Sequence, residues 1–431
     1  MKMKNRFFTI ALVFSAMTVF AQTTGVNDPK SGKTGIVITS LSATNDEVKA
    51  MAIQKDGKIV VAGCSNTDFA IVRYKQDGAL DEGFGKGGIV TTSLRGGDDC
   101  TTALAIQDDG KILAAGASHN GTSKDFALLR YNTNGKLDAS FGKEGMVINS
   151  IQTGDDNASG IAIQKDGKIV IAGSSNNGAS NDFALIRYNP NGTLDKSFGK
   201  KGIIVTSLQT GNDDVAGFTL QPDGKMLVSG SSNNGKSNDF ALARYNVNGT
   251  MDPDFGTGGV VMTSLGNGND DGSGIALQKD GKIIVSGSSD NGTSKDFAMV
   301  RYNANGMLDA SFGKNGIVLN SVQAGDDKAS GLTILKDGKI LVLGTSNNGK
   351  SNDMALARYD ANGKLDAAFG KGGIVVTSLG AGDDTSAGFA IQKDEKIIVC
   401  GTTFNGSTTD FALIRYNANG TLDPTFVAGK K

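Results

Sequence analysis

The chain has 431 residues, with 61 Gly, only five Pro and a formal net charge of −1 at pH 7. A nearly neutral chain gives no reason to expect nucleic acid as a partner, because nucleic-acid-binding proteins normally carry a basic surface. The three Cys are too few, and odd in number, for a disulfide framework to be the main support of the fold.

The first 21 residues are predicted to be a cleavable secretory signal. Basic residues precede an apolar run over residues 7–20, and Val19 and Ala21 suit the cleavage site of a signal peptidase. We therefore expect cleavage near Ala21–Gln22 and a secreted, periplasmic or cell-surface protein. No later apolar run reaches the ~18 residues that a membrane helix needs, so no membrane span is expected.

A predicted linker, residues 22–34, leads to a single predicted strand, residues 35–41 (GIVITSL). Glycine opens this segment and β-branched residues fill it, which is typical of a strand. Six similar segments occur later in the chain, such as GIIVTSL at residues 202–208. Each later copy ends a longer repeating unit, whereas the first copy stands alone.

The repeating unit is marked by two short motifs. All seven Tyr of the chain lie in an Arg-Tyr dipeptide, one in each unit. The turn sequence DGK, once DEK, recurs with its Asp at Asp56, Asp109, Asp166, Asp223, Asp280, Asp337 and Asp394. Internal repeats of this length predict a stack or a closed ring of similar structural units.

Each unit is predicted to form four strands, which we call A to D. In the third unit these are residues 159–164, 168–175, 182–189 and 202–208. Strand C is apolar on both faces, which indicates a sheet covered on both sides. Seven such sheets predict an all-β, seven-bladed β-propeller over residues 35–427, with four antiparallel strands per blade. The expected blades are residues 42–94, 95–151, 152–208, 209–265, 266–322, 323–379 and 380–427, followed by a tail at 428–431.

The last unit lacks its strand D, and the isolated strand at residues 35–41 is a strand D without a blade. We therefore expect the two ends of the chain to complete one blade and close the ring. Ser31 replaces the Phe that the linker before strand D normally carries, and Phe426 supplies it again at the C-terminus. An open solenoid, the competing architecture, would instead have capped ends.

The unit IAIQKDGKIVIAGSSNNGASNDFALIRYNPNGTLDKSFGKKGIIVTSL, residues 161–208, resembles the delta-60 repeat family. Seven tandem matches span nearly all of the chain after the signal. The resemblance implies a β-propeller fold and an exported location. It brings no activity and no catalytic residues that can be transferred to this chain.

Residues that recur in all seven units are expected to serve the architecture, whereas a single binding site requires a break in the symmetry. Four Asp columns recur, and the recurring Arg is expected to pair with one of them. The column before strand A is Asp46, Asp99, Asp156, Asp213, Asp270, Asp327 and Asp384. Its carboxylates either fix turns by accepting hydrogen bonds or ring one mouth of the channel and hold Ca²⁺. The sequence leaves both readings open.

The main break in symmetry is the B–C loop of the first unit, CSNTD, which is four residues shorter than SSNNGASND in the third. We expect a notch above this loop, with Asn66 and Thr67 at its base and Phe404 and His119 as its walls. Arg95 in a D–A loop is expected near by. An aromatic side chain beside a polar pocket suits a small ligand or a peptide end. Neutral drift in exposed loops is the alternative.

The two faces of the ring are predicted to differ in charge. The D–A and B–C loops share one face and carry mostly acidic residues, whereas the A–B and C–D loops share the other and are rich in Lys. Such fields steer partners, so a cationic partner or a divalent metal is expected at the acidic face, and an anionic glycan or lipid surface at the basic face.

No catalytic residue is predicted: the chain has one His, and no nucleophile or zinc motif is present. We expect a monomeric, non-catalytic scaffold without a cofactor that presents loop faces to a protein, peptide or glycan. The alternatives are a carboxylate-dependent enzyme acting on a polysaccharide in the channel, and a Ca²⁺-stabilised adhesion module. Cys64 and Cys100 are expected on the same face of adjacent blades, but as free thiols, because a disulfide needs closely spaced α-carbons.

Overall fold

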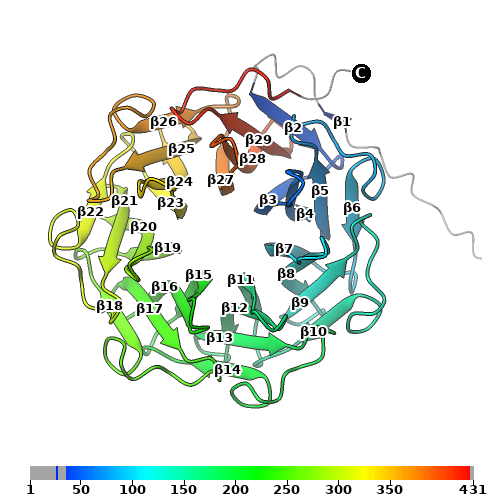
Figure 1. Cartoon of the computed structure of the whole chain (residues 1–431), viewed down its shortest axis with the longest axis horizontal. Helices are drawn as coiled ribbons and strands as arrows, with labels where there is room; N and C mark the ends of the chain where they lie inside the picture. Colours follow the sequence, from blue (N-terminus) through cyan, green and yellow to red (C-terminus); the bar gives the residue numbers. More distant parts are fainter. Residues whose placement is uncertain (1–25, 28–34, 428–431) are drawn as a thin grey trace, which may run out of the picture.

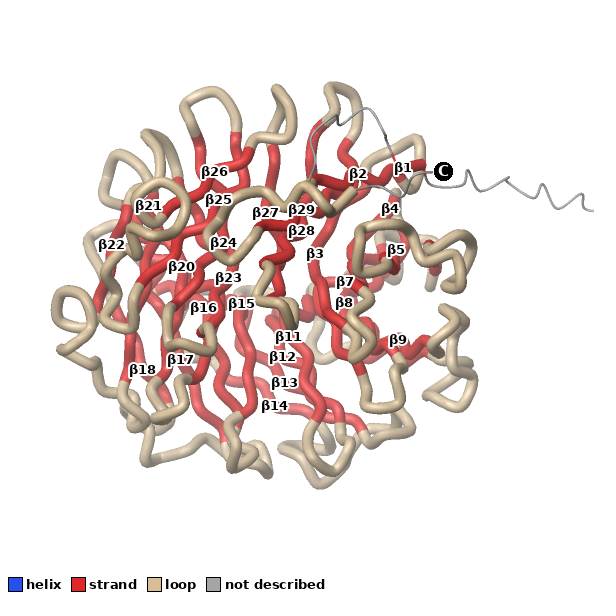
Figure 2. The backbone as a smooth tube through the Cα atoms, turned by 45° about the horizontal axis from the view of Figure 1, so that its top comes forward, coloured by secondary structure: helices blue, strands red, loops and turns tan. Residues whose placement is uncertain are grey.

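Seven β-sheets are arranged radially around a central opening (Figure 1). The computed structural model describes residues 26–27 and 35–427; the predicted signal (1–21), most of the linker (22–34) and the tail (428–431) lie outside this part. The described residues contain strands, turns and loops but no helix (Figure 2), and hence no helix able to cross a membrane. The predicted seven-bladed all-β propeller is confirmed.

The strands of each blade follow one another from the centre outward. The innermost strands (A) are β3 (Asp46–Ile53), β7 (Asp99–Ile106), β11 (Asp156–Ile163), β15 (Asp213–Leu220), β19 (Asp270–Leu277), β23 (Asp327–Ile334) and β27 (Asp384–Ile391). The B strands are β4 (Ile59–Ser65), β8 (Ile112–His119), β12 (Ile169–Asn176), β16 (Met226–Asn233), β20 (Ile283–Asp290), β24 (Ile340–Asn347) and β28 (Ile397–Phe404). The C strands are β5 (Asp68–Tyr74), β9 (Lys124–Tyr131), β13 (Asn181–Tyr188), β17 (Asn238–Tyr245), β21 (Lys295–Tyr302), β25 (Asn352–Tyr359) and β29 (Thr409–Tyr416). The outermost strands (D) are β6 (Ile89–Thr92), β10 (Met146–Asn149), β14 (Ile203–Thr206), β18 (Val260–Thr263), β22 (Ile317–Asn320), β26 (Ile374–Thr377) and β2 (Ile36–Ser40).

The hydrophobic core is divided among the boundaries between blades. At the first boundary, Val60 and Ile71 of one blade pack with Ile112 and Leu129 of the next, and all four side chains are fully buried. Strands B and C are apolar on both faces because each blade packs against a neighbour on either side. The burial of apolar surface therefore joins the blades as well as folding each one.

The ring is closed by a blade built from both ends of the chain, as predicted. Strand β2 pairs with β29 in antiparallel register, with Ile36 opposite Ile414 and Thr39 opposite Phe411. The side chain of Phe426 is fully buried, and its carbonyl accepts a 2.8 Å hydrogen bond from the N–H of Gly35. Phe426 therefore occupies the place of the linker Phe in this blade.

The seventh blade has a fifth strand that the sequence analysis did not predict. Strand β1 (Val26–Asn27) lies within the predicted linker and pairs with the outer edge of β2. Strand β1 covers only Thr39 and Ser40 of this edge, and the other six sheets of the described chain end at strand D without such a cover.

A clasp built on the recurring Arg joins each blade to the next. In blade 1, Arg73 Nε donates to Asp81 Oδ2 at 2.8 Å, and the guanidinium lies 4.4 Å from the ring centre of Phe84. Arg73 Nη1 donates to the carbonyl of Thr133 in blade 2 at 2.6 Å. The hairpin residue Lys58 also pairs with Asp81, at 3.2 Å. The expected pairing of Arg with an Asp column is therefore found, and the same column neutralises lysines of the Lys-rich face.

The clasp recurs at every boundary and completes the circle. The other six Arg repeat the ion pair and the aromatic contact, and the last of them, Arg415, reaches back to the carbonyl of Gln76 in blade 1 at 2.6 Å. The seven Arg are nearly buried, at 4–8% exposure. Buried charges require such partners, so this column is structural.

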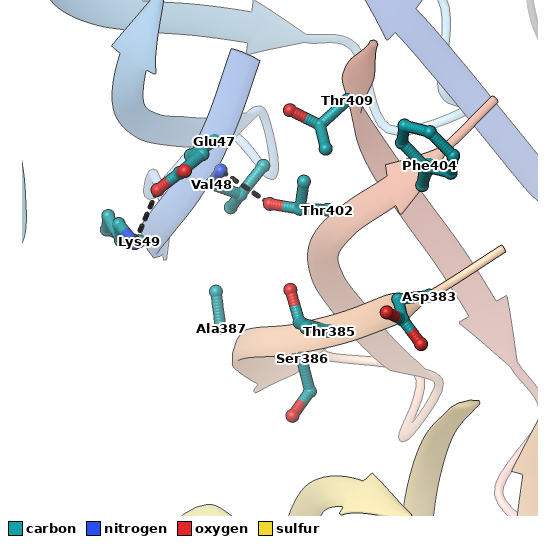
Figure 3. Close-up of a pocket in the computed structure, with 10 residues that line it drawn as sticks. All are labelled: Glu47, Val48, Lys49, Asp383, Thr385, Ser386, Ala387, Thr402, Phe404 and Thr409. Atoms are coloured by element: carbon teal, nitrogen blue, oxygen red, sulfur yellow. Dashed lines mark hydrogen bonds and ion pairs between the residues drawn. The ribbon is translucent and has the colours of Figure 1, made fainter. Parts of the chain in front are cut away.

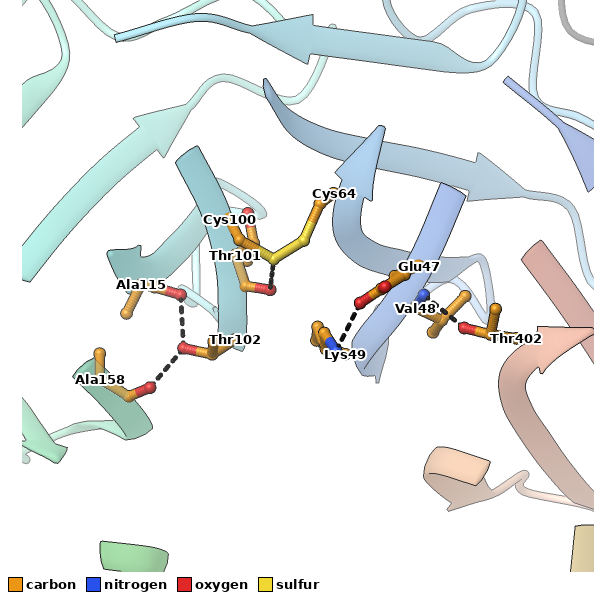
Figure 4. Close-up of a disulfide and its surroundings, with 10 residues drawn as sticks. All are labelled: Glu47, Val48, Lys49, Cys64, Cys100, Thr101, Thr102, Ala115, Ala158 and Thr402. Carbon is orange, nitrogen blue, oxygen red and sulfur yellow. Dashed lines mark hydrogen bonds and ion pairs between the residues drawn. A yellow bond between two sulfur atoms is a disulfide. The ribbon is translucent and has the colours of Figure 1, made fainter. Parts of the chain in front are cut away.

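The prediction of free thiols at Cys64 and Cys100 is wrong: the two residues form a disulfide between blades 1 and 2 (Figure 4). Their α-carbons are 4.8 Å apart, within the range that a disulfide requires. The reason lies in how inner strands meet. At the boundary of blades 7 and 1, Thr402, in the position of Cys64, accepts a 2.9 Å hydrogen bond from the Val48 N–H. Cys64 likewise faces the inner strand of the next blade, where it bonds to Cys100, the residue before the counterpart of Val48. The third thiol, Cys400, is buried and free.

Removing residues 22–41 from the mature chain should lower the melting temperature and cause self-association, because β29 would then present an unpaired edge. Removing only residues 22–34 is the matched control: it deletes β1, keeps β2 and should leave a monomer. Thermal melts and light scattering measure both effects. A monomeric 22–41 deletion with an unchanged melting temperature would exclude the closure described above.

Acid should weaken the clasps. Burial alone would raise the pKa of Asp309, but hydrogen bonds from Ser311 and Lys282 and the charge of Arg301 hold its pKa below the ordinary value. A carboxyl whose pKa is lowered by folding stabilises the protein fully above its unfolded pKa of about 4, and this contribution disappears as the pH falls through the folded pKa.

The variant Asp309→Asn should therefore lose about 2 kcal/mol of stability at pH 7, and the loss should shrink towards pH 2. Asp280→Asn is the control, because Asp280 is an exposed partner of Lys282 and contributes little. Urea unfolding at several pH values measures the difference. A loss for Asp309→Asn that stays constant with pH would contradict the assignment.

Thiol titration of the denatured, unreduced protein should detect one thiol, that of Cys400, and three after reduction. The double variant Cys64→Ser/Cys100→Ser should lose roughly 2–4 kcal/mol of stability, because the unfolded chain is no longer constrained. Three free thiols before reduction would show that the bridge does not form.

Candidate functional site

The predicted ring of seven carboxylates lies inside the blades rather than facing an open channel mouth. Asp46 and its six counterparts are at most 1% exposed. Each accepts a hydrogen bond of 2.6–2.8 Å from a backbone N–H of the preceding D–A loop, as Asp46 does from Leu41. The expectation that these carboxylates ring one mouth of the channel is corrected in that they are buried, since the loops fold over them.

Hydroxyl groups of strand B also donate to several of these carboxylates, as Ser346 does to Asp327. Burial raises the pKa of six of the seven above the ordinary value, although these hydrogen bonds oppose the shift: Asp46, Asp156, Asp213, Asp270, Asp327 and Asp384. These contacts agree with the alternative in which this Asp column fixes turns by accepting hydrogen bonds. In the described part of the chain, no group of three or more His, Cys, Asp or Glu side chains is arranged to hold a metal.

The residues that immediately precede the Asp column before strand A link neighbouring blades. Asp155 Oδ1 accepts from the Lys124 N–H at 2.8 Å, and Asp383 Oδ1 accepts from the Asn352 N–H at 2.8 Å. At the shortened loop of blade 1 the contact is reversed, and the carbonyl of Thr67 accepts from the Asp99 N–H. The acidic residues of this face therefore hold loops in place by accepting hydrogen bonds. This structural role explains why many acidic residues occur on this face.

His119 and Arg95 lie at the boundary of blades 1 and 2 and are engaged there. His119 Nδ1 accepts from the Gly121 N–H at 3.1 Å, which is the turn-capping role that Asn176 plays for Gly178 in blade 3. Arg95 pairs with the nearly buried Asp125. Both side chains therefore have local structural roles.

Phe404 lies at a different boundary and belongs to a separate candidate site. It ends β28, is 37% exposed, and is the one aromatic among the exposed large apolar side chains in the described part of the chain. Its ring lies against Gly382, where a Cβ would approach Phe404 Cδ1 to 2.6 Å. Two cavities adjoin Phe404, and neither is lined by His119, Asn66, Thr67 or Arg95. The structure thus separates Phe404 from the other residues of the predicted notch.

The larger cavity, of about 660 Å³, lies where blades 7 and 1 meet (Figure 3). We call it the seam pocket; its lining residues are Glu47, Val48, Lys49, Asp383, Thr385, Ser386, Ala387, Thr402, Phe404 and Thr409. The second cavity, of about 600 Å³, lies on the other side of Phe404 against the D–A loop at residues 379–382. The aromatic ring thus separates two hollows on one face of the propeller.

The charged residues of the seam pocket are Glu47, Lys49 and Asp383, and the sequence analysis did not select Glu47 or Lys49. These two form a 2.8 Å ion pair and are both exposed. Lys49 lies at a β-bulge in β3, where the register with β4 shifts between Val48 and Ala50. Bulges turn a side chain away from the regular pleat. Comparing units would have found Lys49, because the other six units have Thr, Ser or Ala at this position.

Several solved structures share the fold. A catalytically inactive virginiamycin B lyase from Staphylococcus aureus, solved with quinupristin, has 11% identity and a TM-score of 0.51, with 89% of this chain and 99% of that chain covered. A streptogramin B lyase has 13% identity and a TM-score of 0.50, with 88% and 97% covered. A polysaccharide lyase has 11% identity and a TM-score of 0.48, with 88% and 91% covered. Identities this low show the fold alone.

No curated protein matches the sequence significantly. A family model matches seven segments, one in each blade, at residues 54–84, 107–141, 164–198, 221–255, 278–312, 335–369 and 392–426. The resemblance to delta-60 repeats agrees with this tandem arrangement. The chain belongs to the family described as a domain of unknown function (DUF5122) β-propeller.

Proposed function

We propose that this protein is an exported, non-catalytic binding scaffold and that the seam pocket binds the end of a glycan. The observation that carries the proposal is the exposed ring of Phe404, which stands where six of the units have polar residues or turns. An aromatic face surrounded by polar groups suits a ligand that has one apolar face and many hydroxyls, as a sugar ring does.

The lining of the pocket supports this chemistry. Thr385 and Ser386 offer hydroxyl groups that donate and accept hydrogen bonds, while Glu47 and Lys49 offer a charged acceptor and a charged donor. Residues of β3 and β27 line much of the pocket (Figure 3), and these strands are the innermost of blades 1 and 7, next to the central opening (Figure 1). A chain end can therefore enter it without a conformational change.

Binding is favoured over catalysis because the carboxylates of the pocket are already engaged. Asp383 holds the N–H of Asn352, and Glu47 pairs with Lys49. A polysaccharide-cleaving enzyme would need one carboxylic acid free to give up a proton and one carboxylate free to attack or to activate water. The seam pocket provides neither in its present arrangement.

Export is supported by the N-terminal sequence and by the disulfide. Basic residues followed by an apolar run are typical of a secretory signal. The bond between Cys64 and Cys100 is typical of proteins that fold in an oxidising compartment. Calcium binding by the Asp column stays a prediction, and no role for a metal is proposed.

The variant Phe404→Asn should bind glycans at least tenfold more weakly than the mature protein, because it removes the stacking surface and restores the residue found in blades 3, 4 and 6. A glycan array identifies the best-bound oligosaccharide, and calorimetry then measures the affinity. Phe404→Tyr should retain binding.

His119→Asn is the matched control, because it makes the same restoration two blades further on, at the end of β8, and should leave the affinity unchanged. Thermal melts confirm that each variant is folded. Equal glycan binding by Phe404→Asn and the parent protein, or binding of array peptides in place of glycans, would overturn the proposal.

A further inference from the structure

A second cavity of interest lies on the opposite face, at the boundary of blades 6 and 7. Its volume is about 540 Å³, and it is formed mainly by the two A–B hairpins. It is lined by Thr333, Ile334, Leu335, Lys336, Asp337, Arg358, Ile391, Gln392, Lys393, Glu395, Ile397 and Ala418. We call it the hairpin pocket. It shares no residue with the seam pocket.

Adjacent hairpins are joined by side-chain contacts at three of the other boundaries in the described chain, those of blades 1 and 2, 3 and 4, and 7 and 1. Between blades 1 and 2, Gln54 Nε2 donates to the carbonyl of Gly110 at 3.3 Å, and Lys55 Nζ pairs with Asp108 at 2.9 Å. Between blades 3 and 4, Lys165 donates to the carbonyl of Pro222. These contacts span the space that the hairpin pocket occupies between blades 6 and 7.

At the boundary of blades 6 and 7, both residues of the Gln–Gly contact are replaced. Leu335 stands where the other six units have Gln, and Glu395 stands where the other six have Gly. Leu335 cannot donate a hydrogen bond, and instead packs with Ile391 against the core between blades 6 and 7. Lys336, the counterpart of Lys55, has no hydrogen bond or ion pair with another described residue.

The backbone conformation of Glu395 is unfavourable for a residue other than glycine. Its φ is 67°, in the left-handed region, where the corresponding glycines of the other hairpins have φ of 79–87°. A non-glycine residue in this region is strained, and such strain is concentrated at functional sites. Glu395 and Leu335 both line the pocket.

Arg358 supplies a buried donor to the same pocket. It is 8% exposed and forms the clasp of blade 6 through Nε to Asp366 and Nη1 to the carbonyl of Ala418. In blades 2, 5 and 7, the Nη2 group of the clasp Arg donates to a Ser or Thr hydroxyl. Blade 6 has Ala368 at that position, so Arg358 Nη2 has no partner among the described residues.

We propose that the hairpin pocket binds a small monocarboxylate with an apolar body. The carboxylate would lie between Arg358 Nη2 and Lys336, which are the charge-assisted donors without other partners. The apolar body would lie on Leu335 and Ile391. Asp337 and Glu395, which also line the pocket, repel a second negative charge, which limits the ligand to a single anionic group. This site is independent of the proposed glycan binding, since the two pockets lie on opposite faces.

Phenylacetate, with phenylacetamide as its neutral counterpart, tests the proposal on the mature protein. Saturation-transfer NMR detects binding, and calorimetry measures it. We expect phenylacetate to bind at least tenfold more tightly than phenylacetamide, and more weakly at high salt. The double variant Leu335→Gln/Glu395→Gly, which restores the residues of the other six units, should reduce the affinity at least tenfold without lowering the melting temperature.

Lys336→Glu, an exposed change that leaves the clasp intact, should reduce phenylacetate binding by a similar factor. Lys279→Glu makes the same change at the boundary of blades 5 and 6 and should have no effect, and Phe404→Asn should have none either. Equal binding of phenylacetate and phenylacetamide, no saturable binding of either, or full binding by the double variant would overturn the proposal.

Discussion

The structure depends on the clasp in which one buried Arg joins an Asp, a Phe ring and a carbonyl of the next blade. A guanidinium group cannot be buried without partners, so each Arg requires the linker and the neighbouring blade to be in place together. At the last boundary, Arg415 needs the carbonyl of Gln76 as its partner, although the two residues lie far apart in the sequence. The clasp thereby makes seven small sheets, none of which has an independent core, into one closed ring.

This dependence explains why the recurring charges are poor candidates for function. The linker Asp is held by an Arg and a Lys, and the Asp before strand A is held by loop amides and hydroxyls. Buried groups that hold loops in place in this way have little capacity left for a ligand. The departures from symmetry fall at three consecutive boundaries: the hairpin pocket between blades 6 and 7, the seam pocket between 7 and 1, and the disulfide between 1 and 2.

Most of the fold could be predicted from the sequence, because repeat spacing, strand patterns and a divided last unit all depend on local chemistry. The position of residues across a blade boundary could not, because it depends on how twisted sheets pack. Cys64 and Cys100 meet for this reason, and His119 stays apart from Phe404 for the same reason. The burial of Asp46 depends on a D–A loop folding back over it. Lys49 and Leu335 were accessible to a comparison of units, but they lie in strands and hairpins rather than in the loops where sites are usually sought.

The central claim is that the repeated columns hold the ring and that ligands bind where the repetition fails. Hydrogen–deuterium exchange of the mature protein, with and without the best-bound oligosaccharide of a glycan array, tests it most directly. The account predicts that added protection will be confined to β3, β27 and β28, around Phe404. Equal protection of the corresponding strands in all seven blades, or protection centred on blades 3 to 5, would contradict it.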